Sequence, residues 1–167
     1  MLSQGELSLR TLLTTLTVTL QPQTYTFLTL PPGTSPFSNT SPTTASNTSG
    51  IQMLFHEPTE HQWTLILDSA SEALSTYQAL GAEASPTQWK MLTLDVQSSL
   101  DAVGFMAVVA KALSDAGVSA NVVAGYLHDH VFVQADRAEV ARIAIENVAE
   151  DARAETDTET ELQASAH

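Results

Sequence analysis

Three consecutive residues, His128-Asp129-His130, form a cluster of side chains able to bind a metal ion or move a proton. Residues two apart in an extended strand face the same side, so His128 and His130 could share a metal ion. Asp129 could instead orient an imidazole that acts as a general base. Asp also favours hairpin turns, which require no chemistry. No third ligand lies at a fixed spacing, so we interpret the cluster as a turn and keep a metal-binding protein or an enzyme as an alternative.

Motifs of common enzyme classes do not occur in the sequence. There is no Gly-x-Ser-x-Gly, no glycine-rich phosphate loop and no zinc-protease helix. The chain has no cysteine, which excludes disulfides, thiolate nucleophiles and Cys-ligated zinc. We therefore predict a protein that is not an enzyme and has no catalytic residue, bound metal or cofactor.

The charge balance limits the possible partners. The 167 residues include 6 Lys and Arg against 19 Asp and Glu, a net charge of −13. Such a surface repels phosphate groups, so we expect neither nucleic acid nor a membrane as a partner. Acidic residues are dense near the end of the chain, and we expect residues 151–167 to form a disordered tail. The opening segment fails as a signal peptide because Glu6 precedes the first cation, Arg10, which favours a cytoplasmic protein.

The second half of the chain has the clearest pattern of strands and helices. The expected elements are a strand at 89–96, a helix from Ser98 or Ser99 to Gly117, strands at 118–126 and 130–134, and a helix to about residue 149. The apolar face of the first of these helices would consist of Val103, Met106, Ala110 and Leu113. This β-α-β-β-α order predicts a ferredoxin-like α+β unit, in which helices cover one face of an antiparallel sheet.

The first half gives weaker signals. The expected elements are a helix at about 7–16, strands at 25–30, 51–56 and 63–67, and a helix at 70–79. Residues 31–50 are rich in Pro, Ser, Thr, Asn and Gly and lack periodicity, so we expect a mobile insertion. The residues after Ala149 make a poor strand, so residues 25–30 are expected to complete the second sheet. The halves 1–84 and 85–150 would then interlock.

Two segments of the second half resemble the ACT domain family. Residues 96–104, Val-Gln-Ser-Ser-Leu-Asp-Ala-Val-Gly, resemble the turn between the first strand and helix of that domain, and residues 117–133 resemble the hairpin that follows. More narrowly, the chain resembles small two-ACT proteins of unknown function related to cytosolic arginine sensors. The Leu-rich opening and residues 63–67 fit this family too. Gln97 stands where the family usually has a histidine.

The resemblance implies two interlocked ACT-type halves in a regulatory protein that binds an amino acid or similar metabolite. It also implies a homo-oligomer or a regulated protein partner. The ligand would lie at the strand-helix turn, where the N–H groups of a helix N-terminus suit a carboxylate. Gly104 would let the ligand approach closely, and Asn121 could accept a hydrogen bond from an ammonium group. The predicted ligand-binding residues are Ser98, Ser99, Leu100, Asp101, Val103, Gly104, Phe105, Asn121, Val122 and Val123.

Each of these residues also has a plainer explanation. Ser98, Ser99 and Asp101 could be helix caps and nothing more. Gly104 could serve only close packing between helix and sheet, and Asn121 could be an ordinary polar residue of a strand. A ligand-free interaction or dimerisation module is therefore the first alternative to an amino-acid sensor.

Overall fold

The computed structural model describes residues 5–37 and 50–165, which fall into two compact units. One unit combines residues 1–21 with residues 91–167, and the other consists of residues 22–90. The first 21 residues therefore pack with the second half of the chain, and the division into 1–84 and 85–150 stays a prediction. Among the described residues, no helix is both long enough and apolar enough to cross a membrane.

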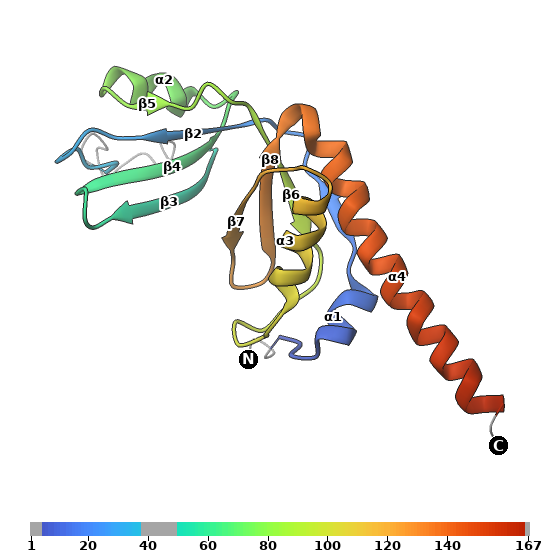
Figure 1. Cartoon of the computed structure of the whole chain (residues 1–167). Helices are drawn as coiled ribbons and strands as arrows, with labels where there is room; N and C mark the ends of the chain where they lie inside the picture. Colours follow the sequence, from blue (N-terminus) through green and yellow to red (C-terminus); the bar gives the residue numbers. More distant parts are fainter. Residues whose placement is uncertain (1–4, 38–49, 166–167) are drawn as a thin grey trace. The chain divides into compact units, whose positions relative to one another are not determined.

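The discontinuous unit has ferredoxin-like strand order. Its elements are α1 (Leu9–Thr15), β1 (Val18–Leu20), β6 (Trp89–Leu94), α3 (Phe105–Asp115), β7 (Ala120–Ala124), β8 (Asp129–Gln134), a 3₁₀ turn (Ala135–Arg137) and α4 (Ala138–Ser165). The strands lie in the order β1-β6-β8-β7. Helices α3 and α4 pack on one face of this sheet, as Figure 1 shows, and α1 lies beside α4. The expected α+β class with helices on one face is confirmed.

The core of this unit lies between the sheet and its helices. Alternate residues of β6 and β8 point inward, and every fourth residue of α3 meets them. The fully or nearly fully buried side chains of these three elements are Leu92, Leu94, Val131, Val133, Phe105, Val109 and Leu113. Of the expected apolar face of α3, Leu113 is buried and Met106 is partly buried against the core, whereas Val103 and Ala110 are exposed and that part of the prediction is wrong.

The strand that completes this sheet is β1, not residues 25–30. Val18 pairs with Leu94 and Leu20 pairs with Leu92, so both β1 side chains lie on the same face as their buried partners. Strand β2 (Tyr25–Thr29) instead pairs along its whole length with β4 (Gln62–Asp68). A three-residue strand is too short to show an alternating pattern, which is why the sequence favoured the longer candidate.

The continuous unit has the same strand order. Besides β2 and β4 it contains β3 (Ile51–Glu57), α2 (Glu72–Ala79) and β5 (Glu83–Ala84), and the strands lie in the order β3-β4-β2-β5. Its core includes Leu28, Leu65 and Tyr77. The expected insertion joins β2 to β3. Residues 38–49 of it lie outside the described residues, and residues 31–37 contain turns.

The acidic end of the chain is helical, contrary to the expected disordered tail. Helix α4 continues for 28 residues to Ser165. Ala, Glu and Gln favour helix locally, and Arg153 and Glu159 add contacts to α1. Those contacts join residues far apart in sequence, so no local pattern could reveal them.

Candidate functional site

The turn between β6 and α3 carries most of the residues predicted to bind a ligand. It was expected to be short, with Ser98 or Ser99 capping the helix. Instead α3 begins at Phe105, and the intervening chain forms a longer loop. The Ser99 side chain accepts a hydrogen bond from the Asp101 amide at 3.3 Å, so it stabilises a local turn inside this loop. Sequence reasoning missed the extra length because Ser and Asp are equally typical of caps and of turns.

Gly104 ends the loop and serves as the N-cap of α3. Its φ of 94° lies in the left-handed region, which side chains with a Cβ rarely adopt. A Cβ placed there would also lie 3.3 Å from Cδ2 of Leu9. The glycine is therefore explained by backbone conformation and by contact with α1, and close approach of a ligand is not needed to account for it.

The N-terminus of α3 opens into a cavity of about 190 Å³. Gly104 has no side chain to cap the helix, and the first N–H groups of any α-helix lack partners within it. The cavity is lined by Ser98, Ser99, Leu100, Ala102, Gly104, Phe105, Met106, Ala107, Ala124 and Asp129. Its wall thus joins the partial positive charge of a helix N-terminus to one carboxylate.

That carboxylate, Asp129, lies at the start of β8 and is only 7% exposed. Its Oδ2 accepts a hydrogen bond from the Ser98 hydroxyl at 3.1 Å, which ties the loop to the hairpin. Buried carboxylates are usually paired with a cation or with several donors. None of the six Lys and Arg side chains forms an ion pair with Asp129 in the described part of the chain. The carboxylate therefore has the capacity to receive a cationic group.

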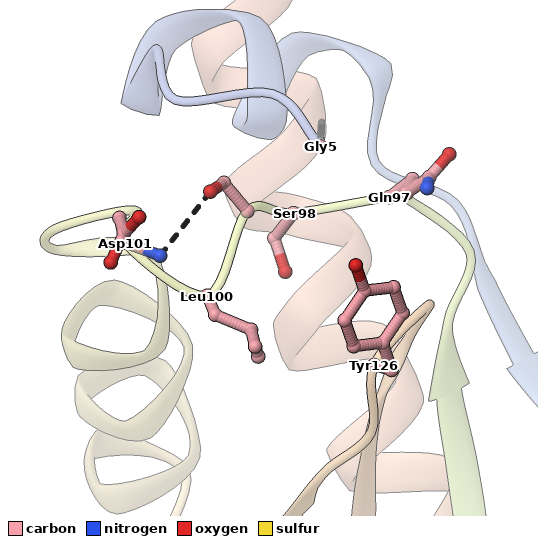
Figure 2. A pocket seen from close by; sticks show the side chains of 7 residues that line it. Gly5, Gln97, Ser98, Leu100, Asp101 and Tyr126 are labelled. Carbon is pink, nitrogen blue, oxygen red and sulfur yellow. Dashed lines mark hydrogen bonds between the residues drawn. The ribbon is translucent and has the colours of Figure 1, made fainter. Parts of the chain in front are cut away.

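A second cavity of about 170 Å³ lies on the other side of the loop. Figure 2 shows Gly5 on one side of it, with Ser98 and Leu100 facing the ring of Tyr126 across the opening. Gln97, Ser99 and Asp101 complete its lining. Ser98, Ser99 and Leu100 line both cavities, so this short segment separates them.

The structure gathers six of the ten predicted residues around the two cavities: Ser98, Ser99, Leu100, Asp101, Gly104 and Phe105. Val103 lines neither and is 84% exposed. Residues 121–123 of β7 line neither cavity, and the residue of β7 that does so is Ala124. Asn121 pairs with Phe132, three residues from the Ala124–Asp129 pair, which is about 10 Å along a strand.

Sequence reasoning missed Gly5, Gln97 and Tyr126 as lining residues, together with Met106 and Ala107 in the first turn of α3. Tyr126 follows Gly125, and the Gly125 amide bonds to the His128 carbonyl at 3.1 Å in the hairpin turn. The turn therefore begins earlier than the expected His128-Asp129 pair. Gly125 is the feature of the sequence that could have predicted a turn at Tyr126, whereas no feature of the sequence indicated that Gly5 lines the cavity.

Asp129 and His130 of the His-Asp-His cluster point to opposite faces of the sheet, because they are neighbours in a strand. His130 bonds through Nδ1 to the Thr93 hydroxyl at 3.2 Å, on the face of the sheet opposite the helices. Burial lowers the pKa of His130 below its ordinary value of 6.5, and the proximity of His128 lowers it further. Across residues 5–37 and 50–165, no three His, Asp or Glu side chains are grouped to hold a metal ion.

Comparison with known proteins identifies the family. Two family models, both described as an ACT domain, match residues 4–77 and 84–147. A crystal structure of a protein of unknown function from Vibrio cholerae, described as a possible transport protein, is 33% identical in sequence with a TM-score of 0.63. That match covers 84% of this chain and 95% of that one. The chain belongs to the ACT domain family.

More distant solved structures share the fold. The ligand-free regulatory subunit of aspartate kinase from Thermus thermophilus is 16% identical, with a TM-score of 0.59 and coverage of 78% of this chain and 95% of that one. A putative C-terminal regulatory domain of aspartate kinase from Porphyromonas gingivalis is also 16% identical, with a TM-score of 0.53 and coverage of 81% and 98%. No curated protein matches the chain.

Proposed function

We propose that this ACT protein is a sensor that binds a free amino acid in the 190 Å³ cavity and performs no chemistry on it. The observation that carries the proposal is the pairing of an uncapped helix N-terminus with the buried Asp129 carboxylate on one cavity wall. The ligand's carboxylate would accept hydrogen bonds from the first amides of α3. Its ammonium group would pair with Asp129.

The size of the cavity supports a ligand of this class. A volume of about 190 Å³ holds roughly six water molecules at about 30 Å³ each, which suits a compact amino acid and not a nucleotide. Expelling that water would strengthen both charged interactions. Arginine and lysine belong among the compounds to test because of the resemblance to arginine sensors.

Regulation would follow from differential binding. A ligand that bridges the α3 N-terminus and β8 stabilises the arrangement of the loop that holds both walls together. A partner protein, or a second copy of the chain, would then respond to that arrangement. Regulatory parts of aspartate kinases share this fold, which is consistent with a regulatory role for the present chain.

Thermal unfolding against the twenty amino acids tests the proposal. A ligand present at 100 times its Kd adds about 2.7 kcal/mol to the free energy of unfolding. For a chain of this size that raises Tm by roughly 5–10 °C. A rise with one amino acid or one chemical class supports the sensor. A well-folded protein whose Tm stays the same throughout the panel contradicts it.

A ligand-free interaction module is the second candidate, because apolar side chains are exposed at the same loop. The exposed fractions are 69% for Leu100, 84% for Val103 and 63% for Tyr126. Exposed apolar clusters of this kind often mark protein contacts. Sedimentation distinguishes the two candidates: a tight oligomer that ignores every amino acid supports the interaction module, and its loss in Leu100→Ser would place the contact at the loop.

A further inference from the structure

The segment that precedes α1 lies directly against the loop between β6 and α3. Glu6 forms a parallel bridge with Ser98. The Glu6 amide donates to the Gln97 carbonyl at 2.9 Å, and the Ser99 amide donates to the Glu6 carbonyl at 2.9 Å. A Cβ on Gly5 would lie 2.5 Å from the carbonyl carbon of Ser98 and from the Ser99 amide nitrogen. The loop is thus bound by a piece of chain more than 90 residues away in sequence.

Helix α1 fixes this segment in place. The Glu6 carboxylate accepts hydrogen bonds from the amides of Leu7 and Ser8 at 2.8 and 2.6 Å. Ser8 then caps α1 by accepting from the Thr11 amide. Leu9, the first residue of the helix, lies against Gly104 at the other end of the loop. Segment and helix together therefore contact the loop at both of its ends.

The far end of α1 is held by the C-terminal part of α4. Arg153 donates from Nε to the Thr14 carbonyl at 2.8 Å and from Nη2 to the Leu16 carbonyl at 2.7 Å. These carbonyls belong to the last turn of α1, where a cation is also favoured by the helix dipole. Arg10 adds an ion pair with Glu159 at 2.6 Å, but both side chains are half-exposed, so this contact contributes little. Arg153 is therefore the main polar connection, alongside the burial of Leu12 and Leu16 in the core shared with α4.

We propose that residues 5–16 act as a strap that positions the ligand-binding loop and couples it to the C-terminal part of α4. The coupling half of this inference rests on the proposed function. Linkage is reciprocal, so whatever loosens or holds the end of α4 changes ligand affinity, and ligand binding changes the order of that end. Arg153 is a positioning residue in this scheme. It acts through α1 and touches neither cavity.

Amide hydrogen exchange of the full-length protein measures the strap without any ligand. The Ser99 amide is the reporter, because its hydrogen bond to Glu6 exists only while the strap is in place. Arg153→Ala should speed exchange at Ser99 about ten-fold while leaving the buried Ile145 amide of α4 unchanged. Arg142→Ala is the matched control, since within residues 5–37 and 50–165 the ion pairs of Arg142 are with Glu139 and Glu146 of α4 itself, and it should leave exchange at Ser99 unchanged.

Gly5→Ala perturbs the same contact from its other end. The added methyl group would collide with backbone atoms of the loop, so Gly5→Ala should also speed exchange of the Ser99 amide. This variant keeps Arg153, so it still tests the strap if Arg153→Ala unfolds α1. Unchanged Ser99 exchange in both variants overturns the strap. Faster exchange in Arg142→Ala equal to that in Arg153→Ala would also overturn it, because the effect would then be a general loosening of α4.

Isothermal titration with whichever amino acid binds completes the test. Arg153→Ala should weaken binding about five-fold or more, and Arg142→Ala should not. If an amino acid binds with the same Kd to both variants while Ser99 exchange differs, the coupling is wrong and the sensor stands. If no amino acid binds but Ser99 responds as expected, the sensor is wrong and the strap remains as a structural link.

Discussion

Asp129→Asn probes the charge that the proposed site supplies to its ligand. The amide side chain keeps nearly the same shape and still accepts the hydrogen bond from Ser98, so the fold should survive. Two unit charges about 4 Å apart attract with about 4 kcal/mol at the effective dielectric of a protein surface. Part of that energy is recovered because the neutral variant needs less desolvation and retains a hydrogen bond. A net loss of about 2 kcal/mol is therefore expected, or about 30-fold in Kd.

Isothermal titration calorimetry with the amino acid identified by the thermal panel measures that loss. Asp101→Asn is the matched control, because Asp101 lies on the same loop but is exposed and does not line the 190 Å³ cavity. It should change Kd by less than about three-fold, as exposed charges usually do. Wild-type affinity in Asp129→Asn, or an equal loss in both variants, would refute the assignment of the ammonium group to Asp129.

Four further perturbations follow from the same geometry. Ala107→Glu should weaken ligand binding at least ten-fold, because the new carboxylate competes with the ligand for the N-terminus of α3. Tm should stay equal or rise slightly, because a carboxylate is favoured in the first turn of a helix. A parallel loss of Tm and of binding would argue against the site. Gly104→Ala should lower the free energy of unfolding by about 1–2 kcal/mol and Tm by about 2–8 °C, because its φ is positive, and an unchanged Tm would contradict this. Deleting residues 151–167 removes Arg153 and should cost about 2 kcal/mol in urea unfolding, whereas a dispensable tail would cost nothing. Burial lowers the pKa of His130 in the folded state, so the contribution of neutral His130 to the free energy of unfolding is complete above pH 6.5. That contribution declines as the pH falls from 6.5 toward the lower pKa of the folded state. Urea unfolding at pH 7.5 and 5.5 should therefore show a smaller pH dependence in His130→Asn than in wild type.

The regular elements of this fold were largely visible in the sequence. Strands β6 and β8 are rich in buried apolar residues, and Gly117 ends α3 as a left-handed glycine, so their approximate positions were predictable. The start of α3 was not predictable, because the sequence does not show whether a glycine such as Gly104 has a positive φ or only allows close packing.

Contacts between distant residues explain the remaining differences. The three residues of β1 are recognisable as a strand only through their pairing with β6. The second half of α4 is supported by α1, across 139 residues in the case of Arg153 and Thr14. At the site, the residues typical of a helix N-terminus were enough to predict the loop. The presence of Ala124 and Asp129 in the cavity wall depends on the register of the β7–β8 hairpin, which the sequence did not indicate.

The most direct test of amino-acid binding at the N-terminus of α3 is an NMR titration that follows backbone amides as the candidate amino acid is added. We expect the largest shift changes at Phe105, Met106 and Ala107, because their N–H groups would donate hydrogen bonds to the ligand carboxylate. Residues 121–123 of β7 should move little. Saturable shifts elsewhere in the chain, with these three amides unmoved, would contradict the proposed site.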